Sequence, residues 1–566
     1  MLRHLLPIVL LPAAGLLAWL ALGTREPRAD FVFTCPEPRT LDPQRVSWLA
    51  EIQLAAAMFE GLTRLNADTF APEPAVAQSW ETASDPPRYT FHLRPEARWS
   101  NGEPVTAEDF RAAWLRALDP QCEAQYAGLL FAIQGAAAYY SSRSDADATN
   151  DQPPETVGVV ALDERTLRVT LAGPCQYFLE LTSFITLAPA HRPTLARWAY
   201  RDGRVLRSTQ HLSTRPENIV CNGPFVLDRW DFKQRVFLRR NPHYWDADSI
   251  ALSSLEALIT SDTNAALLAY QTGRADLVSP IERSVAQLLR RAQQAGRRSD
   301  FHSSDRFATF FYRVNCRRPP LDDANLRKAL SLALDRDALC AHVLQLGETP
   351  AYTYVPVPAL SLMDRPGPHG GRVRYQPPHG LGADLSADER VALARDLLRR
   401  SGYDPRTDRP LELAFPPEAE QRFLAEAIQA LWEHHLGLRV ELRMVEGKVL
   451  SQMIRNLDYD LARSDWFGDY LDPGTFLDMF TTADGQNRTG WSSPAYDALI
   501  AAAAREHDPA RRYAAFQQAE QILTEDELPI LPVFFRRGNY LLSPRFDGVR
   551  DNVRDLLQVH RARVRR

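Results

Sequence analysis

The chain has 566 residues, too many for a single hydrophobic core, so its length predicts about three or four folding units. With 45% hydrophobic and 24% charged residues, its composition is that of a soluble globular protein. The formal net charge of -5 argues against the basic surface that neutralises phosphates, so we expect no nucleic-acid partner.

The N-terminal segment is apolar and begins behind Arg3. Its apolar run extends from Leu5 to Leu22 and is followed by polar residues 24–26. This pattern is typical of a secretory signal peptide, and the run is also close to the roughly 20 residues that span a bilayer. Residues 1–30 are therefore predicted to be a signal peptide or an N-terminal membrane anchor. The mature protein should lie in the periplasm or on the outer face of the cytoplasmic membrane.

Strand-like apolar runs occur in residues 31–63 and 191–307. One of them, Phe225–Leu227, follows Asn222-Gly223, a pair that often forms turns. The intervening residues 64–190 are predicted to form a separate α+β unit.

A helix in this intervening unit is predicted to begin after Thr106. Thr106 has the N-cap position, and Asp109 lies three residues later, where it can complete a capping box. Apolar Phe110 and Trp114 follow at helical spacing.

Residues 308–536 alternate strands with amphipathic helices, as an α/β lobe does. Two helices are predicted over Ala387–Arg400 and Ala419–Leu436, with Gly402 and Gly437 just past their ends. A strand is predicted over 438–442. The last residues, 537–566, end in a run of arginines (Arg561, Arg563, Arg565 and Arg566) that predicts a solvated tail.

The segment 463–477 combines aromatic rings, carboxylates and an arginine around Gly468 and Pro473. It resembles the W-x-x-D-Y-x-x-P-x-x-F-L signature of periplasmic oligopeptide- and dipeptide-binding proteins, the substrate receptors of peptide ABC transporters. Other segments match the same family in the same order: 41–43, 58–62, 74–80, 89–94, 99–110, 222–225, 240–245, 327–330, 333–336 and 350–356. The resemblance therefore covers nearly the whole chain.

The resemblance implies a fold of mixed α/β class, the bilobal class II (cluster C) periplasmic-binding-protein fold. Lobe I would consist of residues 31–63, 191–307 and 537–566, and lobe III of residues 308–536. Residues 64–190 would form an additional α+β domain, called domain II here. A hinge between the lobes would let them close over a ligand.

The function implied by the resemblance is capture of peptides and their delivery to an ABC permease in the inner membrane. We expect a monomer without a cofactor or a metal. An enzyme is disfavoured because the sequence contains no HExxH, G-x-S-x-G or phosphate-loop pattern. Two alternatives stay open: the same fold with another ligand, such as a haem, a metal chelate or a sugar, and a peptide sensor that does not transport.

Asp469 is the candidate for binding the ammonium group of a peptide, because it matches the aspartate of the family motif. A buried charge needs a partner, so a receptor for many peptides should hold an anion for this group. The alternative is a turn or helix cap. Glu51 matches a cleft-facing glutamate of oligopeptide-binding proteins, with a solvated helix face as its alternative.

The cleft wall is predicted to include Trp466, Phe467, Gly468 and Asn222. Aromatic rings offer a flat apolar surface, and a glycine lets the backbone approach the ligand. For Trp466, packing in the core is the alternative.

Arg463 and Arg455 are the candidates for binding the peptide's terminal carboxylate, since arginine contacts a carboxylate through two donors. Both come from the family match. The alternative is a chance arginine, because 63 of the 66 basic residues are arginine and the lysines are Lys233, Lys328 and Lys448. The cleft-side lysine of oligopeptide-binding proteins is replaced here by Leu344.

Six cysteines are present, two in each predicted unit: Cys35 and Cys221 in lobe I, Cys122 and Cys175 in domain II, and Cys316 and Cys340 in lobe III. Export permits disulfides, and a bridge inside each unit would leave the hinge free. The predicted pairs are therefore Cys35 with Cys221, Cys122 with Cys175, and Cys316 with Cys340. Buried free thiols are the alternative.

Overall fold

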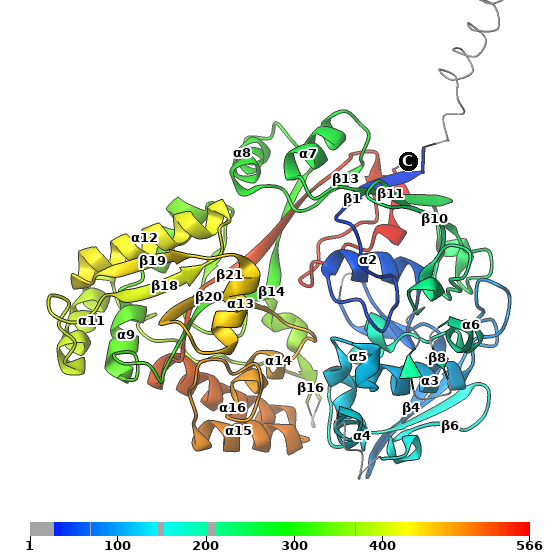
Figure 1. Ribbon diagram of the computed structural model, residues 1–566, viewed down its shortest axis with the longest axis horizontal. Helices are drawn as coiled ribbons and strands as arrows, with labels where there is room; N and C mark the ends of the chain where they lie inside the picture. Colours follow the sequence, from blue (N-terminus) through cyan, green and yellow to red (C-terminus); the bar gives the residue numbers. More distant parts are fainter. Residues whose placement is uncertain are drawn as a thin grey trace, which may run out of the picture.

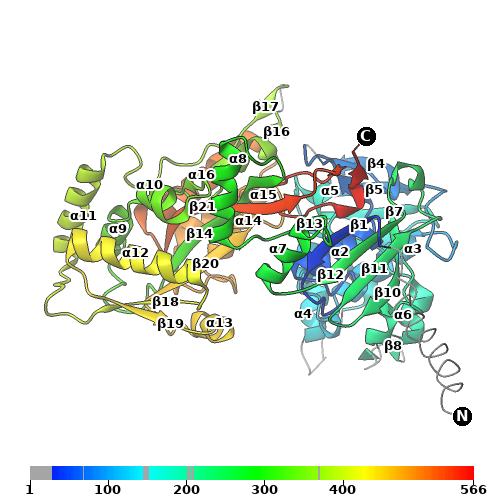
Figure 2. The same cartoon turned by 90° about the horizontal axis from the view of Figure 1, so that it is seen from above.

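The computed structural model of the protein describes residues 28–67, 69–144, 152–198, 200–201, 205–206, 210–367 and 370–565. Figure 1 shows two lobes joined by long strands, which confirms the predicted bilobal α/β architecture. Figure 2 shows the two lobes side by side from above, with β21 passing between them. The predicted signal or anchor segment lies almost wholly outside the described residues. None of the helices in the described ranges is long and apolar enough to cross a membrane.

One sheet of eleven strands extends through both lobes, in the order β10-β11-β12-β1-β13-β21-β14-β20-β18-β19, with β15 paired to β21. Its strands are β1 (Phe31–Cys35), β10 (Phe225–Asp231), β11 (Arg235–Arg240), β12 (Ser254–Ile259), β13 (Leu277–Val278), β14 (Phe301–Val314), β15 (Thr349–Pro350), β18 (Leu411–Phe415), β19 (Val440–Met444), β20 (Leu461–Phe467) and β21 (Ile530–Leu542).

The two longest strands, β14 and β21, connect the lobes (Figure 1). They pair antiparallel from Phe301↔Leu541 to Arg313↔Ile530, and the register shifts between Asp305 and Thr309 and again between Phe310 and Phe311. A shifted ladder has fewer regular hydrogen bonds, so the link between the lobes can bend more easily at these two irregularities.

The helices are α2 (Leu49–Met58), α3 (Ala107–Ala117), α4 (Ala136–Ser144), α5 (Phe178–Leu181), α6 (Arg192–Trp198), α7 (Thr263–Gln271), α8 (Arg283–Gln294), α9 (Ala324–Leu332), α10 (Arg336–Ala338), α11 (Ala387–Ser401), α12 (Ala419–Leu436), α13 (Gly447–Arg455), α14 (Gly474–Leu477), α15 (Pro494–Arg505) and α16 (Pro509–Gln521). Short strands form small two-stranded pairs: β2 (Thr63–Leu65) with β3 (Pro72–Pro74), β8 (Tyr200–Arg201) with β9 (Val205–Leu206), β16 (Arg365–Pro366) with β17 (Arg372–Val373), and β22 (Phe546–Asp547) with β23 (Arg563–Val564).

Domain II has its own antiparallel sheet, formed by β4 (Ala77–Ser84), β5 (Pro87–Leu93), β7 (Thr166–Thr170) and β6 (Val159–Ala161). The predicted capping box is confirmed: Thr106 and Asp109 form it at the start of α3. Phe91, Phe110 and Trp114 belong to one buried cluster with Phe31 of lobe I. Domain II therefore shares a continuous core with lobe I.

Lobe III confirms the two predicted helices. α11 ends at Gly402 with φ of 73° and α12 at Gly437 with φ of 66°, backbone angles that glycine adopts at little cost. The predicted strand lies two residues later than expected, since β19 begins at Val440 and pairs parallel with β18.

Asn222-Gly223, predicted as a turn-forming pair, instead holds two segments of the chain together. The buried Asn222 side chain accepts a hydrogen bond from the Glu60 amide at 3.1 Å and donates to the Glu60 carbonyl at 2.9 Å. A Cβ on Gly223 would lie 2.6 Å from the Phe59 nitrogen. The pair therefore joins two segments of lobe I, and only glycine fits the second position.

The three predicted disulfides are wrong: all six cysteines are free thiols in the structure. Cys316 and Cys340 belong to different buried clusters of lobe III. Cys122 lies near Arg116 and Cys175 near Asp472 of the other lobe. The Cys35 thiol donates to the Pro36 carbonyl at 3.1 Å, while the Cys221 backbone pairs with Ser100. Cys35 and Cys221 belong to one large buried cluster without forming a bond, and each cysteine packs as a small apolar residue.

Candidate ligand-binding cleft

A cleft of about 730 Å³ lies between the lobes, within the usual size range of small-ligand sites. Lobe III contributes Phe467, Gly468 and Asp469. The opposite wall comes from α2, domain II, the 191–307 segment of lobe I and the C-terminal segment. Its residues include Leu49, Ile52, Ala56, Arg64, Tyr126, Phe184, Tyr244, Asp246, Arg550, Arg554, Asp555, His560 and Arg561. Because both lobes line it, a ligand bound here would hold them together.

Asp469 lies in this cleft, directly after β20. Its own amide donates to the Thr475 hydroxyl at 3.0 Å, and the preceding Gly468 amide donates to the Phe307 carbonyl at 2.8 Å. These bonds fix the backbone that carries the Asp469 side chain. Burial raises the pKa of its carboxyl to about 6, and the positive charge of Arg554 only partly offsets this rise.

The Asp469 carboxylate forms no ion pair or hydrogen bond with any described residue. The alternative of a turn or helix cap is therefore not what the structure shows. A half-buried acid without a partner can gain a charged hydrogen bond from a ligand cation.

The rest of the predicted cleft wall divides into residues that face the cleft and residues that do not. Phe467 lines it with 46% of its surface exposed, and Gly468 lines it as well. A Cβ at Gly468 would overlap the Phe307 ring, so the close approach requires glycine. Trp466 does not line it: the indole packs against a lobe III core cluster and donates to the Thr475 carbonyl at 2.7 Å. Asn222 is not among the lining residues either, because it is bonded to Glu60.

Glu51 caps the start of α2. Its carboxylate accepts the amides of Arg39, Ser47 and Trp48 at 2.9, 3.1 and 3.2 Å. Burial raises the pKa of Glu51, but the hydrogen bonds from Arg39 and from these amides outweigh it, so the pKa is lowered. The side chain is buried, so the solvated helix face is wrong. A ligand role stays a prediction, and the geometry does not support it.

The Arg463 side chain is bonded to other residues of lobe III. Its guanidinium bonds the Asp465 carboxylate at 2.7 Å and the Gln421 side chain at 3.0 Å, and it packs over the Phe310 ring. It is not among the residues that line the cleft. Burial lowers the pKa of Arg463, and the nearby Asp465 opposes this shift.

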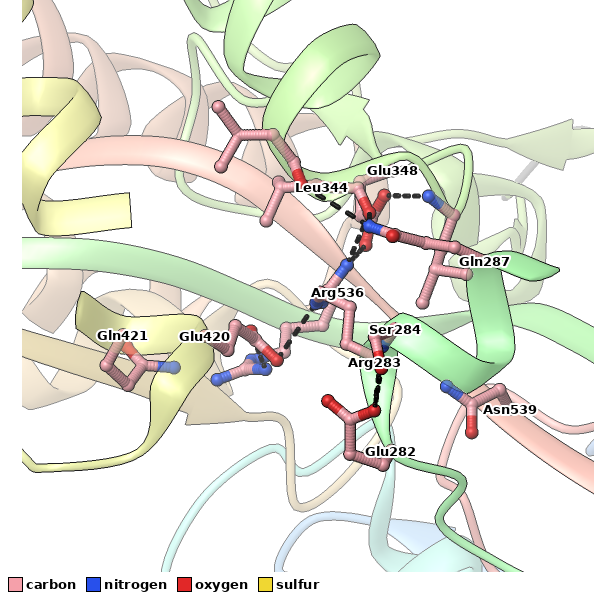
Figure 3. Close-up of polar contacts among 12 residues, drawn as sticks. Glu282, Arg283, Ser284, Gln287, Leu344, Glu348, Glu420, Gln421, Arg536 and Asn539 are labelled. Atoms are coloured by element: carbon pink, nitrogen blue, oxygen red, sulfur yellow. Dashed lines mark hydrogen bonds and ion pairs between the residues drawn. The ribbon is translucent and has the colours of Figure 1, made fainter. Parts of the chain in front are cut away.

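Asp465 also bonds Arg536 at 2.7 Å, which extends the network toward the strands that join the lobes. Figure 3 shows the continuation, with Glu420 between Arg536 and Arg283. Arg283 in turn pairs with Glu420 at 3.0 Å and with Glu348 at 2.6 Å. Three arginines thus face three carboxylates, and the network is neutral without a ligand. Leu344, at the position of the family's lysine, contributes its backbone carbonyl to Arg283 (Figure 3).

Arg455 lies at the exposed end of α13, where it bonds the Gln452 side chain at 3.0 Å. It is not among the residues that line the cleft.

The cleft also contains residues that the sequence analysis did not predict. Arg554 and Arg561, from the C-terminal segment, line it, so the predicted solvated tail is wrong for Arg561. Arg561 is half-buried and donates to the Leu65 carbonyl at 3.2 Å. The described residues contain no group of histidine, cysteine and acidic side chains that could hold a metal ion.

Comparison with known proteins identifies the family. The family model of bacterial extracellular solute-binding proteins, family 5 Middle, matches residues 71–488. The chain belongs to this family. It is 30% identical over 517 residues to the oligopeptide-binding protein OppA of Bacillus subtilis, covering 91% of this chain and 88% of that protein. It is 32% identical over 519 residues to the dipeptide-binding protein DppE of the same organism, with the same two coverages.

Solved structures show the same fold. The murein tripeptide binding protein MppA of Escherichia coli superimposes with a TM-score of 0.77 at 27% identity, covering 95% of this chain and 99% of MppA. OppA of Haemophilus influenzae in complex with RPPGFSPFR superimposes with a TM-score of 0.75 at 26% identity, again covering 95% and 99%. The predicted class II periplasmic-binding-protein fold is thereby confirmed for this family member.

Proposed function

We propose that this protein is an extracytoplasmic receptor that captures peptides between its two lobes and delivers them to an ABC transporter. The observation that carries the proposal is Asp469, a half-buried carboxylate that no described residue pairs with, in a cleft lined by both lobes. Family membership supports it, as do relatives named for binding oligopeptides and dipeptides.

Asp469 would accept the ammonium group of the bound peptide. The peptide backbone can add to β20, whose pairing with β18 covers only Leu461 and Ala462. The segment Arg463–Phe467 pairs with β14 on one side, and no described strand pairs with its other edge, which leaves that edge available for main-chain hydrogen bonds that do not depend on the ligand's side chains. Such contacts suit a receptor for many sequences.

Closure would be coupled to binding because the contacts come from both lobes. A ligand that touches both walls stabilises the closed state by its differential affinity for that state. β14 and β21 would bend while each lobe keeps its own core.

We also propose that the protein acts as a monomer, outside the cytoplasm, in contact with membrane permease subunits, and is held there by residues 1–30 if these are not cleaved. The proposed division is lobe I at 31–63, 191–307 and 537–566, domain II at 64–190 and lobe III at 308–536. The course of β14 and β21 supports the boundaries near 307 and 536.

Native mass spectrometry of the protein purified under mild conditions tests the ligand class. We expect the retained ligands to be peptides with a free N-terminus, displaced by added synthetic peptide. Retention of a haem, a metal chelate or a sugar, with no binding of peptides in calorimetry, would contradict the proposal.

A further inference from the structure

Domain II contacts lobe III immediately beside Asp469. Both carboxylate oxygens of Glu180, on α5, accept the amide of Leu471, at 3.1 and 3.0 Å. The rings of Tyr177 and Tyr470 stack with centroids 3.8 Å apart and planes 6° from parallel. The lobe III residues of this contact, Tyr470 and Leu471, directly follow Asp469 in the chain, and the contact joins the two sides of the cleft.

Glu180 also pairs with an arginine that lines the cleft. It is 5% exposed and forms an ion pair with Arg554 at 3.2 Å. Arg554 lines the same cleft as Asp469 and is close enough for its charge to act on the pKa of that carboxyl. Arg554 therefore lies within the influence of two carboxylates, and the structure pairs it with Glu180.

We propose that Glu180 is a positioning residue for ligand binding, which keeps Arg554 paired away from Asp469 so that Asp469 stays available to the ligand's ammonium group. This inference rests on the proposed function. It assigns a specificity role to a residue of domain II that does not itself line the cleft.

The charges of Glu180, Asp469 and Arg554 explain why Glu180 must be ionised for Asp469 to bind a ligand cation. Glu180 and Asp469 carry two negative charges and Arg554 one positive charge, so the ligand's ammonium makes the group neutral. If Glu180 lost its charge, Arg554 and Asp469 would form a neutral pair by themselves. A cationic ligand would then have to displace a guanidinium that is already held in the cleft.

The same contact links specificity to closure. The Leu471 amide belongs to lobe III, whereas Glu180 belongs to domain II, so their hydrogen bonds exist only while the two sides meet. When the cleft is closed, the Glu180 carboxylate therefore fixes both the backbone beside Asp469 and the position of Arg554.

The test compares Glu180→Gln with wild type by calorimetry at pH 7, using one peptide with a free N-terminus and the same peptide N-acetylated. Wild type should prefer the free form by about tenfold or more. Glutamine keeps the shape and an acceptor for the Leu471 amide but not the charge, so the preference should fall close to one. Glu155→Gln, an exposed substitution in domain II, is the matched control and should keep the preference.

The double variant Glu180→Gln/Arg554→Gln distinguishes positioning from a structural role. With the competing guanidinium removed, preference for the free N-terminus should return. Equal preference in wild type and Glu180→Gln, or no recovery in the double variant, would overturn this inference. A wild type that binds both peptide forms equally would instead contradict the role of Asp469 and with it the basis of the proposed function.

Discussion

Asp469 and Arg463 lie six positions apart in one segment, yet they differ in whether the protein supplies an opposite charge. Arg463 is bonded to Asp465 and Gln421 inside a neutral network of lobe III. Asp469 has no such partner among the described residues and carries a pKa raised by burial. The difference teaches that a charge available to a ligand is one that the fold has left unpaired. A motif gives the position of such a charge but not its availability.

Breaking the Arg463 network should have the largest effect. Asp465→Ala leaves the guanidinium groups of Arg463 and Arg536 without their shared carboxylate, and both side chains are less than 20% exposed. We expect the free energy of unfolding to fall by about 3 kcal/mol or more. Urea denaturation measures this.

The control for that variant is Asp396→Ala, which removes the surface pairs of Asp396 with Arg399 and Arg400. This change should cost less than about 1 kcal/mol. Equal losses in the two variants would show that the lobe III network is no more than a set of surface pairs, and Arg463 would again be a candidate for binding a ligand carboxylate.

Replacing the unpaired charge should affect binding instead of folding. Asp469→Asn removes the partner of the ammonium group, and we expect about 1.5 to 3 kcal/mol less binding free energy, or roughly ten- to a hundredfold weaker affinity. The unliganded variant should unfold at no lower temperature than wild type, since a neutral amide avoids the cost of desolvating a carboxylate. Calorimetry and thermal unfolding check the two parts, and unchanged affinity would remove Asp469 from the site.

Affinity should also depend on pH in a direction fixed by Asp469. With its pKa at about 6 in the unliganded protein, the carboxyl is mostly protonated at pH 5 and must lose a proton to bind an ammonium group. Affinity should therefore be about tenfold weaker at pH 5 than at pH 7.

The contribution of Asp469 to folding has the opposite sign. Its folded pKa lies above the unfolded value, so this stabilisation is complete below the unfolded pKa and is lost as pH rises through about 6. Titrations at pH 5, 6 and 7 with Asp469→Asn as the control separate the two effects. The variant should show a flat profile between pH 5 and 7, and a slope equal to that of wild type would assign the titration to another group.

The smallest effect is expected at Arg455. Its side chain contacts Gln452 on the exposed end of α13 and not the cleft. Arg455→Ala should change stability by less than about 0.5 kcal/mol and leave peptide affinity unchanged. A tenfold loss of affinity in calorimetry would place this arginine in the site after all.

Features set by neighbouring residues could be predicted from the sequence. The capping box of Thr106 and Asp109, and the glycines that end α11 and α12, need only a few adjacent residues to form. The fold class and the position of Asp469 in the cleft were predicted from a family resemblance that extends over most of the chain.

Features set by distant partners could not be predicted in this way. Arg463 bonds Gln421, 42 positions away, and the carboxylate that neutralises it, Asp465, is shared with Arg536, 71 positions from Asp465. Arg554 meets Glu180 only because the C-terminal segment returns to the cleft. The disulfide predictions were wrong for a related reason. Two cysteines per unit satisfies a count, but a bridge requires the two sulfur atoms to meet, and even Cys35 and Cys221, which share one buried cluster, form no bond.

The most direct test of the whole account is the affinity of the wild-type protein for one peptide in two forms, free and N-acetylated, measured by calorimetry at pH 7. Acetylation should weaken binding by about tenfold or more, because it removes the positive charge that Asp469 binds. Equal affinity for the two forms would contradict it.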